Sequence, residues 1–442
     1  MNNRARLRLG IVCAAWIGSG GTLAMTAATG AETPEWPGWG GPQRDFVCRL
    51  AKDLAIDWPK DGPPKLWSRE IGDGYSSIIV EGDRLYTMCR RENQDAVLAL
   101  DARTGKTIWE TRYDAPIAPG QNTQFGPGPH ATPLLVGDRL FTIGATVKLH
   151  CLDKKTGRIL WSHDLMKEMA ASHLMFGYGA SPTPYRDLVI VTVPGGNKPV
   201  VAFKQETGDV AWKSENLRLL GESSPVFMKV GGKTHLAVMA GVAIVGLDPE
   251  TGKTLWKAPI EGKAGQTMST PNAGADGIIF ATSAYGGGCW GVKVDAKPDG
   301  GYDARQIFHN LYLKVHHESV VRVGDFVYGS SGDFGPAILV AMNVKTGKVA
   351  WRERGFAKAN LIYADGKMIV LDEDGDLAIA TATPESLTVH SRANILTHQA
   401  WTVPTLIGST LYLRDRKTIM ALDLGKQAAA KAGGASTDRG AR

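Results

Sequence analysis

The chain has few cysteines, five among 442 residues, and they form neither a C-x-x-C pair nor an adjacent pair. Structural zinc sites and dithiol redox centres need such spacings, so the pattern disfavours both. A C-x-x-C-H sequence for haem attachment is also absent. The four cysteines beyond the N-terminal region are interpreted as free buried thiols: Cys48, Cys89, Cys151 and Cys289. Their wide spacing does not exclude a disulfide in an oxidising compartment.

Common catalytic motifs are missing as well. The sequence has no Ser-His-Asp motif, no phosphate-binding glycine loop and no nucleophile elbow. It also has no long basic run, and its formal charge of +6 falls to +3 without Arg4, Arg6 and Arg8 of the N-terminal region. The composition therefore predicts no nucleic acid as a partner.

The N-terminal region has the order of a secretory signal. Residues 1–8 carry three Arg and no acid, residues 9–28 are apolar or small, and Ala28 to Ala31 are small residues before Glu32. This order predicts a signal peptide at 1–31 that is cleaved near residues 28–31. The alternative is a membrane anchor, but the glycines between 18 and 21 disfavour a spanning helix, and no second long apolar stretch follows. We therefore expect a soluble periplasmic or secreted protein with no transmembrane segment in the mature chain.

The body of the chain repeats a ten-residue phrase that contains a Thr-Gly turn and ends in tryptophan. Five copies end at Trp109, Trp161, Trp212, Trp256 and Trp351, with spacings of 52, 51, 44 and 95 residues. The last spacing is about twice the others, so a degenerate copy is expected at 294–308. A period of 40–50 residues is typical of arrays and propellers.

Each phrase predicts two strands joined by a tight turn. Its glycine, Gly105 in the first copy, supplies the positive φ of a hairpin with a bulge, while Asp101 can bind backbone N–H groups of the turn. A second hairpin signal, Gly-Asp before an apolar pair, lies upstream at 82–86, 137–141 and 324–328. One unit is therefore a four-stranded propeller blade.

Counting the units gives eight blades, whose first strands start near Ser77, Thr132, Ser181, Ser224, Thr270, Ser319, Asn360 and Val403. The eighth unit lacks its own Trp strand, and an orphan strand around Trp67 lies at the other end of the sequence. We predict an all-β, eight-bladed β-propeller of four-stranded antiparallel blades, closed by the N-terminal strand in the C-terminal blade. The expected organisation is an N-terminal segment at 32–63, the propeller at 64–424 and a disordered tail at 425–442.

The blade tryptophans are expected to fill the gaps between neighbouring blades, because an indole buries a large apolar area. These structural residues are Trp67, Trp109, Trp161, Trp212, Trp256 and Trp351.

The repeat L-D-x-x-T-G-K-x-x-W resembles that of the pyrroloquinoline quinone (PQQ)-like propellers over residues 64–424. This family includes quinoprotein alcohol dehydrogenases, polyvinyl-alcohol dehydrogenase-like proteins and the non-enzymatic outer-membrane assembly factor BamB. The segment from Trp36 to Asp45 resembles the leading motif of exported members from planctomycete-type bacteria. The resemblance implies the fold, whereas the repeat residues build blades rather than sites.

Candidate binding residues come from the loops that lead into the first strands, which reach the mouth of a propeller's channel. The residue two positions before each first strand contributes to a ring, and the loops at 112–130 and 164–180 are expected to wall it. The candidates are Tyr75, His130, Tyr178, Glu222, His317, Glu318, Lys358 and Trp401. Together they predict a polar cleft on rigid strands. The alternative is an ordinary channel of small polar residues and water.

No metal site is predicted. His316, His317 and Glu318 are successive, and successive strand residues point to opposite faces, so they are not expected to share one ion. The acidic stretch from Asp372 to Asp376 is interpreted as a solvated turn, because residue 383, the twelfth position of a calcium loop, is Thr383 rather than Glu.

Two functions remain as hypotheses, with a small-ligand or glycan binder as a further alternative. The first is a non-catalytic exported scaffold, BamB-like, that binds an unknown protein of the cell envelope or a small ligand at the channel mouth. The second is a PQQ-dependent quinoprotein dehydrogenase that oxidises an alcohol or polymer. The resemblance implies that such enzymes hold PQQ between a Trp and an adjacent-Cys disulfide, with calcium. This sequence has no adjacent Cys pair, so PQQ with calcium is not the preferred cofactor prediction.

Overall fold

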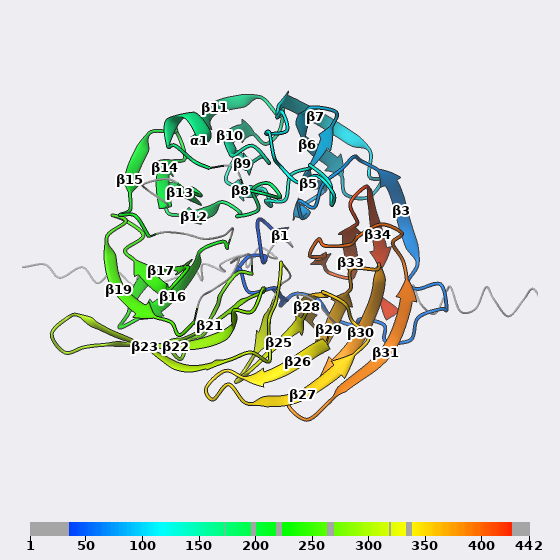
Figure 1. Cartoon of the computed structure of the whole chain (residues 1–442). Coiled ribbons are helices and arrows are strands. Elements are labelled where there is room, and N and C mark those ends of the chain that lie inside the picture. The colour runs from blue at the N-terminus through cyan, green and yellow to red at the C-terminus, as the bar shows by residue number, and fades with distance from the viewer. Residues whose placement is uncertain are drawn as a thin grey trace, which may run out of the picture. The chain divides into compact units, whose positions relative to one another are not determined.

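Eight β-sheets stand in a ring around a common centre, which confirms the predicted propeller (Figure 1). The structure, a computed structural model, describes residues 35–172, 174–195, 200–217, 223–262, 269–317, 320–332 and 338–426. The predicted signal peptide and the predicted tail from residue 427 onward lie outside these ranges. The described part contains one short helix, α1 (Leu165–Glu168). None of its helices has the length and apolar character needed to cross a membrane.

Each blade has four antiparallel strands, ordered from the central channel outwards. The first four blades are β4 (Ile79–Glu81), β5 (Arg84–Arg91), β6 (Gln94–Asp101) and β7 (Thr107–Asp114); β8 (Leu134–Val136), β9 (Arg139–Ile143), β10 (Lys148–Asp153) and β11 (Ile159–Asp164); β12 (Thr183–Tyr185), β13 (Leu188–Thr192), β14 (Val200–Lys204) and β15 (Val210–Lys213); and β16 (Val226–Val230), β17 (Lys233–Ala240), β18 (Ala243–Leu247) and β19 (Thr254–Pro259).

The other four blades complete the ring. They are β20 (Asn272–Ala273), β21 (Ile278–Ser283), β22 (Gly288–Ala296) and β23 (Tyr302–Asn310); β24 (Val321–Val323), β25 (Phe326–Ser331), β26 (Ile338–Asn343) and β27 (Val349–Arg354); β28 (Asn360–Ala364), β29 (Lys367–Leu371), β30 (Asp376–Ala382) and β31 (Leu387–Asn394); and β32 (Thr405–Ile407), β33 (Thr410–Arg414), β34 (Thr418–Asp423) and β3 (Lys65–Glu70). Two short strands, β1 (Glu35–Trp36) and β2 (Val47–Cys48), add to the inner edges of the first and seventh blades.

The Thr-Gly turns have the predicted geometry. The five turn glycines have φ between 68° and 81°, and each hairpin shows a register shift beside the turn. In the first copy, one carboxylate oxygen of Asp101 accepts hydrogen bonds from the backbone N–H groups of Arg103 and Thr104. The turn therefore forms from local chemistry, independently of the neighbouring blade.

The turn glycines have a second role, because each meets an aromatic ring from the preceding blade. A Cβ added to Gly157 would lie 2.5 Å from a ring atom of Trp109, and Gly105 stands in the same relation to Trp67. The indole N–H groups of Trp67, Trp109, Trp161, Trp212 and Trp351 donate to carbonyl groups of the next blade at 2.8–3.1 Å. Neighbouring blades are therefore joined by one ring and one hydrogen bond at each of these positions.

Trp256 differs from the other blade tryptophans. Its indole N–H donates to Nδ1 of His235, 2.9 Å away in its own blade. The next blade is the predicted degenerate copy, in which the long β22–β23 hairpin replaces the Thr-Gly turn. Phe308 of that hairpin takes the position of a blade tryptophan and lies against Gly347.

The hydrophobic core lies between blades rather than within one central core. One cluster joins Tyr86 and Val97 of the first blade to Leu140 and Leu152 of the second, and comparable clusters follow around the ring. Each face of a blade is covered by a neighbouring blade, so we expect an isolated blade to be unstable.

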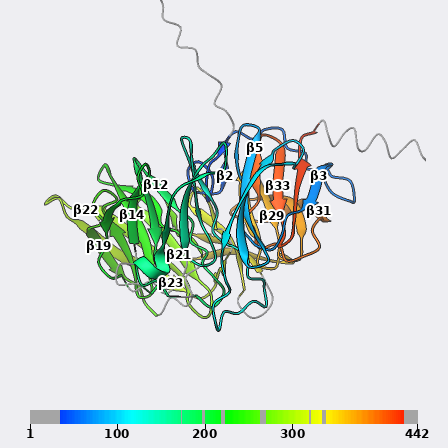
Figure 2. The same cartoon turned by 90° about the horizontal axis from the view of Figure 1, so that it is seen from above.

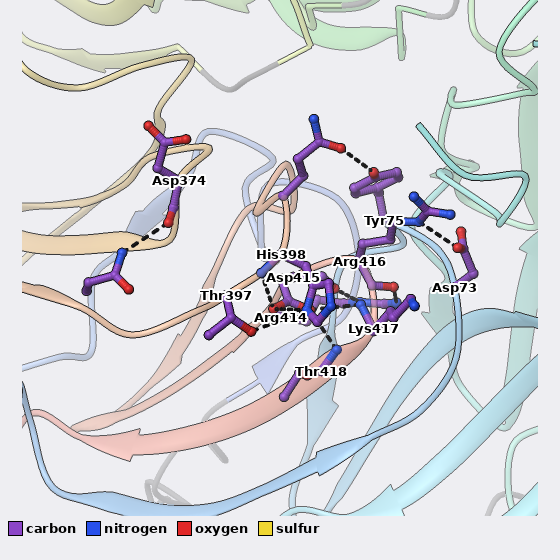
Figure 3. Close-up of polar contacts among 12 residues, drawn as sticks. Asp73, Tyr75, Asp374, Thr397, His398, Arg414, Asp415, Arg416, Lys417 and Thr418 are labelled. Carbon is purple, nitrogen blue, oxygen red and sulfur yellow. Dashed lines mark hydrogen bonds and ion pairs between the residues drawn. The ribbon is translucent and has the colours of Figure 1, made fainter. Parts of the chain in front are cut away.

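The ring closes where the two ends of the propeller meet. Trp67 in β3 pairs with Ala421 in β34, and β3 lies beside the last blade in both views (Figures 1 and 2). Arg414 crosses from the last blade to the first: its guanidinium donates to the carbonyl groups of Gly74 and Met88, both at 2.7 Å. Figure 3 shows Arg414 among the polar residues at this seam. Head-to-tail closure removes the two free sheet edges of the ring.

Candidate functional site

A cavity of about 780 Å³ opens at the mouth of the channel, where the loops enter the inner strands. Aromatic rings make up much of its wall, together with histidines and a lysine. These aromatic, histidine and lysine lining residues are Trp39, Tyr75, Phe125, His130, Phe176, Tyr285, His316, His317, Lys358 and Trp401. A cavity of this size is in the range that holds a small ligand.

Five predicted ring residues line this cavity together: Tyr75, His130, His317, Lys358 and Trp401. Two others, Glu222 and Glu318, lie outside the described residues. Tyr178 was expected in the cavity wall, but it is buried in the cluster between the second and third blades, and its hydroxyl donates to the carbonyl of Thr192 at 2.7 Å. The loop that carries Tyr178 reaches the cavity through Phe176 instead.

Trp401, Lys358 and Glu373 form a bonded group on one side of the cavity. The indole N–H of Trp401 donates to Oε2 of Glu373 at 2.9 Å, and Nζ of Lys358 lies 3.0 Å from the same oxygen. The Lys358 ammonium also lies 5.6 Å from the centre of the Trp401 ring. Glu373 therefore holds the orientation of both lining residues.

Sequence reasoning missed Glu373. It lies in the acidic turn between β29 and β30, whose place at the mouth face was the available signal. The turn is also less solvated than expected: Asp372 is 2% exposed and accepts hydrogen bonds from the N–H groups of Asp374 and Asp376. Burial raises the pKa of Asp372 to about 6.

Tyr75 connects several parts of the wall. Its hydroxyl donates to the carbonyl of Phe125 at 2.5 Å, and its ring lies 5.3 Å from that of Trp401 and 5.4 Å from that of His130. Burial raises the pKa of Tyr75 above its ordinary value. The phenol is therefore neutral and acts as a structural donor at physiological pH.

The adjacent histidines correct a sequence interpretation. His316 and His317 precede β24 in a loop rather than alternating along a strand, and their Nδ1 atoms lie 2.9 Å apart. His316 Nε2 lies 2.7 Å from the hydroxyl of Tyr285. Burial lowers the pKa of His317 well below its usual range, with smaller contributions from His316, Lys358 and His130. Burial likewise lowers the pKa of His130 to about 4, so both imidazoles are uncharged at neutral pH.

The loop wall is held from below by Arg90. Gln124 and Phe125 of this loop, at 112–130, line the cavity. Arg90 is 4% exposed; its guanidinium donates to the carbonyl of Ala115 at 2.6 Å and lies 3.6 Å from Asp95. The wall therefore rests on a buried, hydrogen-bonded support.

Trp39 is a lining residue that no ring position predicted. It comes from the N-terminal segment, and its indole N–H donates to the hydroxyl of Thr270 at 2.8 Å. Thr270 lies two residues before Asn272, where the inner strand of the fifth blade begins, and Trp39 belongs to the segment whose strand β1 pairs with the inner strand β4. Trp39 therefore reaches the cavity from the channel side.

The charge of the lining is simple. Among the described lining residues, Lys358 is the one lysine or arginine, and none is a carboxylate or a thiol. The described residues contain no group of three or more His, Cys, Asp or Glu side chains arranged to hold a metal. Cys48, Cys89, Cys151 and Cys289 are all free and buried.

Comparisons with known proteins identify the family of the repeat and find the same fold in solved structures. A family model described as outer membrane protein assembly factor BamB matches residues 93–353, more than half of the chain. The chain belongs to this BamB-like family of PQQ propeller repeats. Its fold is also found in solved structures: the TM-score is 0.56 with BamB from Moraxella catarrhalis, at 20% identity over 81% of this chain and 97% of that one.

Relatives of this BamB-like chain include both outer membrane assembly factors and dehydrogenases. BamB of Burkholderia pseudomallei is 25% identical over 70% of this chain and 74% of its own length. A polyvinylalcohol dehydrogenase of a Pseudomonas species is 26% identical over 49% of this chain, which spans only 33% of that enzyme. A quinohemoprotein alcohol dehydrogenase from Comamonas testosteroni has a TM-score of 0.65 at 15% identity, covering 90% of this chain and 82% of that one. That structural likeness concerns the fold alone.

Proposed function

We propose that this chain is an exported, non-catalytic propeller that binds a ligand, or a segment of a partner protein in the cell envelope, in the mouth cavity. The observation that carries the proposal is the cavity itself, walled by aromatic rings around a lysine that Glu373 holds in place. The match to a BamB-like family supports a binding role.

The chemistry of the lining suits an apolar ligand with a negative charge. His130 and His317 are uncharged at neutral pH, and the described lining has no carboxylate that would repel an anion. Aromatic faces offer apolar area, and Lys358 offers one positive charge. The preferred ligand is therefore an apolar or aromatic group that carries a negative charge.

A pair of fluorescent probes tests this proposal. We would titrate the mature protein with 8-anilinonaphthalene-1-sulfonate, which is anionic, and with the neutral N-phenyl-1-naphthylamine. We expect single-site binding of the anionic probe with a Kd on the order of 10 µM. Trp401→Ala should weaken both probes about tenfold, because it removes a ring from the wall.

The charge is tested separately. Lys358→Ala should weaken the anionic probe about fivefold and leave the neutral probe unchanged. The control variants are Lys345→Ala, at an exposed lysine paired with Asp325, and Trp58→Ala, whose indole donates to Ala55 outside the cavity. Equal binding by wild type, Trp401→Ala and Lys358→Ala, with native near-ultraviolet dichroism in each, would refute the proposal.

Export is part of the same proposal. Expression of the full chain with N-terminal sequencing of the mature protein should give a start near residues 29–32. A mature protein that begins at residue 1 or 2 in the cytoplasm would remove this part of the proposal.

A second candidate is PQQ-dependent oxidation of an alcohol or polymer. It is favoured by the identity shared with a polyvinylalcohol dehydrogenase over 249 residues. The described residues do not fit a calcium-bound quinone: the four cysteines are separate and buried, and no group of three metal-binding side chains occurs among these residues. We therefore derive no step through this cofactor. Incubation with PQQ and calcium, followed by alcohol-dependent dye reduction, tests the candidate, and turnover would replace the scaffold proposal.

A further inference from the structure

The segment from Glu35 to Cys48 lies inside the ring of blades. Its first strand, β1, pairs antiparallel with β4, the inner strand of the first blade. Its second strand, β2, pairs in parallel with β28, the inner strand of the seventh blade. The inner strands run from the mouth of the channel to its far side. The segment therefore runs toward the mouth in β1, along the first blade, and away from the mouth in β2, along the seventh blade. Figure 1 places β1 at the centre of the ring.

The turn of this segment is a compact, self-bonded structure. Gly40 and Gly41 have φ of 76° and 79°, and the N–H of Phe46 donates to the carbonyl of Gly40 at 2.9 Å. The rings of Trp39 and Phe46 meet edge to face, with centroids 5.2 Å apart. A Cβ on Gly40 would lie 2.7 Å from backbone atoms of Arg44, so glycine is required there.

The segment also contacts inner strands, or their entrances, on opposite sides of the ring. Besides the first and seventh blades, it reaches the second, third, fifth and eighth. These contacts are Pro37 O with Leu135 N at 2.8 Å, Arg44 Nη2 with Thr183 Oγ1 at 3.0 Å, Trp39 Nε1 with Thr270 Oγ1 at 2.8 Å and Cys48 Sγ with Leu406 O at 3.3 Å. A segment bonded on all these sides occupies the width of the channel.

The Arg44 side chain anchors this arrangement. Burial lowers the pKa of its guanidinium to about 10, and its donors reach the carbonyl of Pro182 and the hydroxyl of Thr183. Arg49, five residues later, lies at the surface in an ion pair with Asp45. Arg49 directly follows the segment and is exposed, so it offers a matched arginine for comparison with Arg44.

We propose that residues Glu35–Cys48 are a built-in plug that closes the channel beneath the mouth cavity. Trp39 is its ligand-facing residue and sets the depth of the site. The ligand role of Trp39 rests on the proposed function, whereas the plug itself does not. A ligand enters and leaves only through the mouth, and its deepest group meets the Trp39 ring.

The plug also orients the ligand. Counted back from the turn at the far end of each inner strand, Lys358 lies six residues before Ala364, whereas Thr270 lies four residues before Gly274. Trp39, which is bonded to Thr270, therefore lies about two residues, or roughly 7 Å, deeper than Lys358. The Trp39 N–H is already bonded to Thr270, so its ring offers an apolar surface. An amphiphilic anion therefore binds with its apolar end inward and its charged end toward Lys358.

Hydrogen exchange on the full mature protein tests the plug. Amides within 36–48 should be protected as strongly as inner-strand amides of the same blades. Arg44→Ala should raise exchange in this segment about tenfold or more, whereas the matched control Arg49→Ala should leave it unchanged. Thr183→Val, which removes only the acceptor for Arg44, should act in the same direction if Arg44→Ala does not fold. Exchange of residues 36–48 at the rate of an unstructured peptide in the wild type would overturn the plug.

The two fluorescent probes test the ligand role of Trp39. Trp39→Ala should weaken both probes about fivefold or more, while Trp58→Ala should change neither. Unchanged probe affinity in Trp39→Ala, alongside a loss in Trp401→Ala, would overturn the depth-setting role and leave the proposed function standing. Protected amides in 36–48 without any probe binding to the wild type would support the plug and reject the proposed function.

Discussion

Trp401 donates its indole N–H to Oε2 of Glu373 at 2.9 Å, so an acid outside the cavity lining fixes the orientation of a ring inside it. The same carboxylate oxygen lies 3.0 Å from Nζ of Lys358. Glu373 therefore partly neutralises the positive charge of Lys358. The attraction of Lys358 for an anion depends on this acid, which does not line the cavity.

This relationship predicts an increase in anion affinity in Glu373→Gln. The amide oxygen can still accept from Trp401, but the negative charge beside Lys358 is gone, so the anionic naphthalene sulfonate should bind about fivefold more tightly at low salt. The neutral naphthylamine should bind as in the wild type. Fluorescence titration of both probes is the measurement, with Glu250→Gln, an exposed acid paired with Arg186, as control. Weaker binding of the anionic probe would contradict the prediction.

The blade joints predict a specific cost for Gly157→Ala. This glycine has φ of 73°, and a Cβ there would meet the Trp109 ring at 2.5 Å, so we expect a loss of roughly 2–4 kcal/mol in the free energy of unfolding. The matched control is Gly137→Ala, where φ is 56° but no atom lies within 4 Å, and the expected loss is about 1 kcal/mol.

A double-mutant cycle separates the two causes. In a Trp109→Ala background the cost of Gly157→Ala should fall part of the way toward that of Gly137→Ala, because the clashing ring is gone while Thr111 Oγ1, 2.7 Å from the added Cβ, remains. Chemical denaturation of the four proteins measures this. An undiminished cost would mean that the Trp109 ring does not contribute to the requirement for glycine.

The seam predicts a large effect of Arg414→Met. The Arg414 side chain is fully buried, and its removal leaves the carbonyl groups of Gly74 and Met88 without their donor. We expect a loss of about 3–5 kcal/mol, together with faster hydrogen exchange in β3 and β34. Arg84→Met, at a partly exposed position, should cost less than about 1 kcal/mol. A small, uniform effect of Arg414→Met would show that the seam does not depend on this residue.

The buried His150 predicts part of the acid sensitivity. It is 5% exposed and lies 4.1 Å from the Tyr113 ring, and burial lowers its pKa to about 4. The pKa of His150 is lower in the folded protein than its unfolded value near 6.5, so the neutral side chain favours the folded state most at pH values above 6.5. This contribution to the free energy of unfolding is lost as the pH falls toward 4. Between pH 7 and pH 5 this contribution should fall by about 2 kcal/mol.

His150→Phe keeps a ring beside Tyr113 but has no group that titrates. The free energy of unfolding of this variant should therefore change less between pH 7 and pH 5 than that of the wild type. Asp95, whose pKa burial raises to about 6, contributes the opposite slope in both proteins, so the difference between the two curves reports His150. Urea denaturation at a series of pH values is the measurement. Parallel curves for wild type and variant would contradict the assignment.

The fold was predictable because its signals are local and repeated. The Thr-Gly turns, the position of Trp109 after its turn and the orphan strand around Trp67 follow from backbone preferences within about ten residues. Repetition made even the degenerate fifth blade visible, with Phe308 at the position of a blade tryptophan. The predicted first strands began up to two residues early, because residues such as Ser77 belong to the entry loop and are not paired in a sheet.

The site was predictable only where it follows the repeat. Tyr75, His130 and Lys358 meet in one cavity because every blade begins at the same level of the channel. Tyr178 was misplaced because its loop does not follow that register. His316 and His317 were misread because alternation applies to strands and not to loops.

The sequence by itself determined the number of blades, their turns and the strand that closes the ring, because each depends on neighbouring residues and on a pattern repeated along the chain. Only the tertiary structure decided that Glu373 supports Trp401 and that Trp39 reaches the cavity from the channel side. Trp39 and Thr270 are 231 residues apart, and no local preference specifies such a contact. It exists because a closed ring of eight sheets leaves one central space, which the N-terminal segment enters.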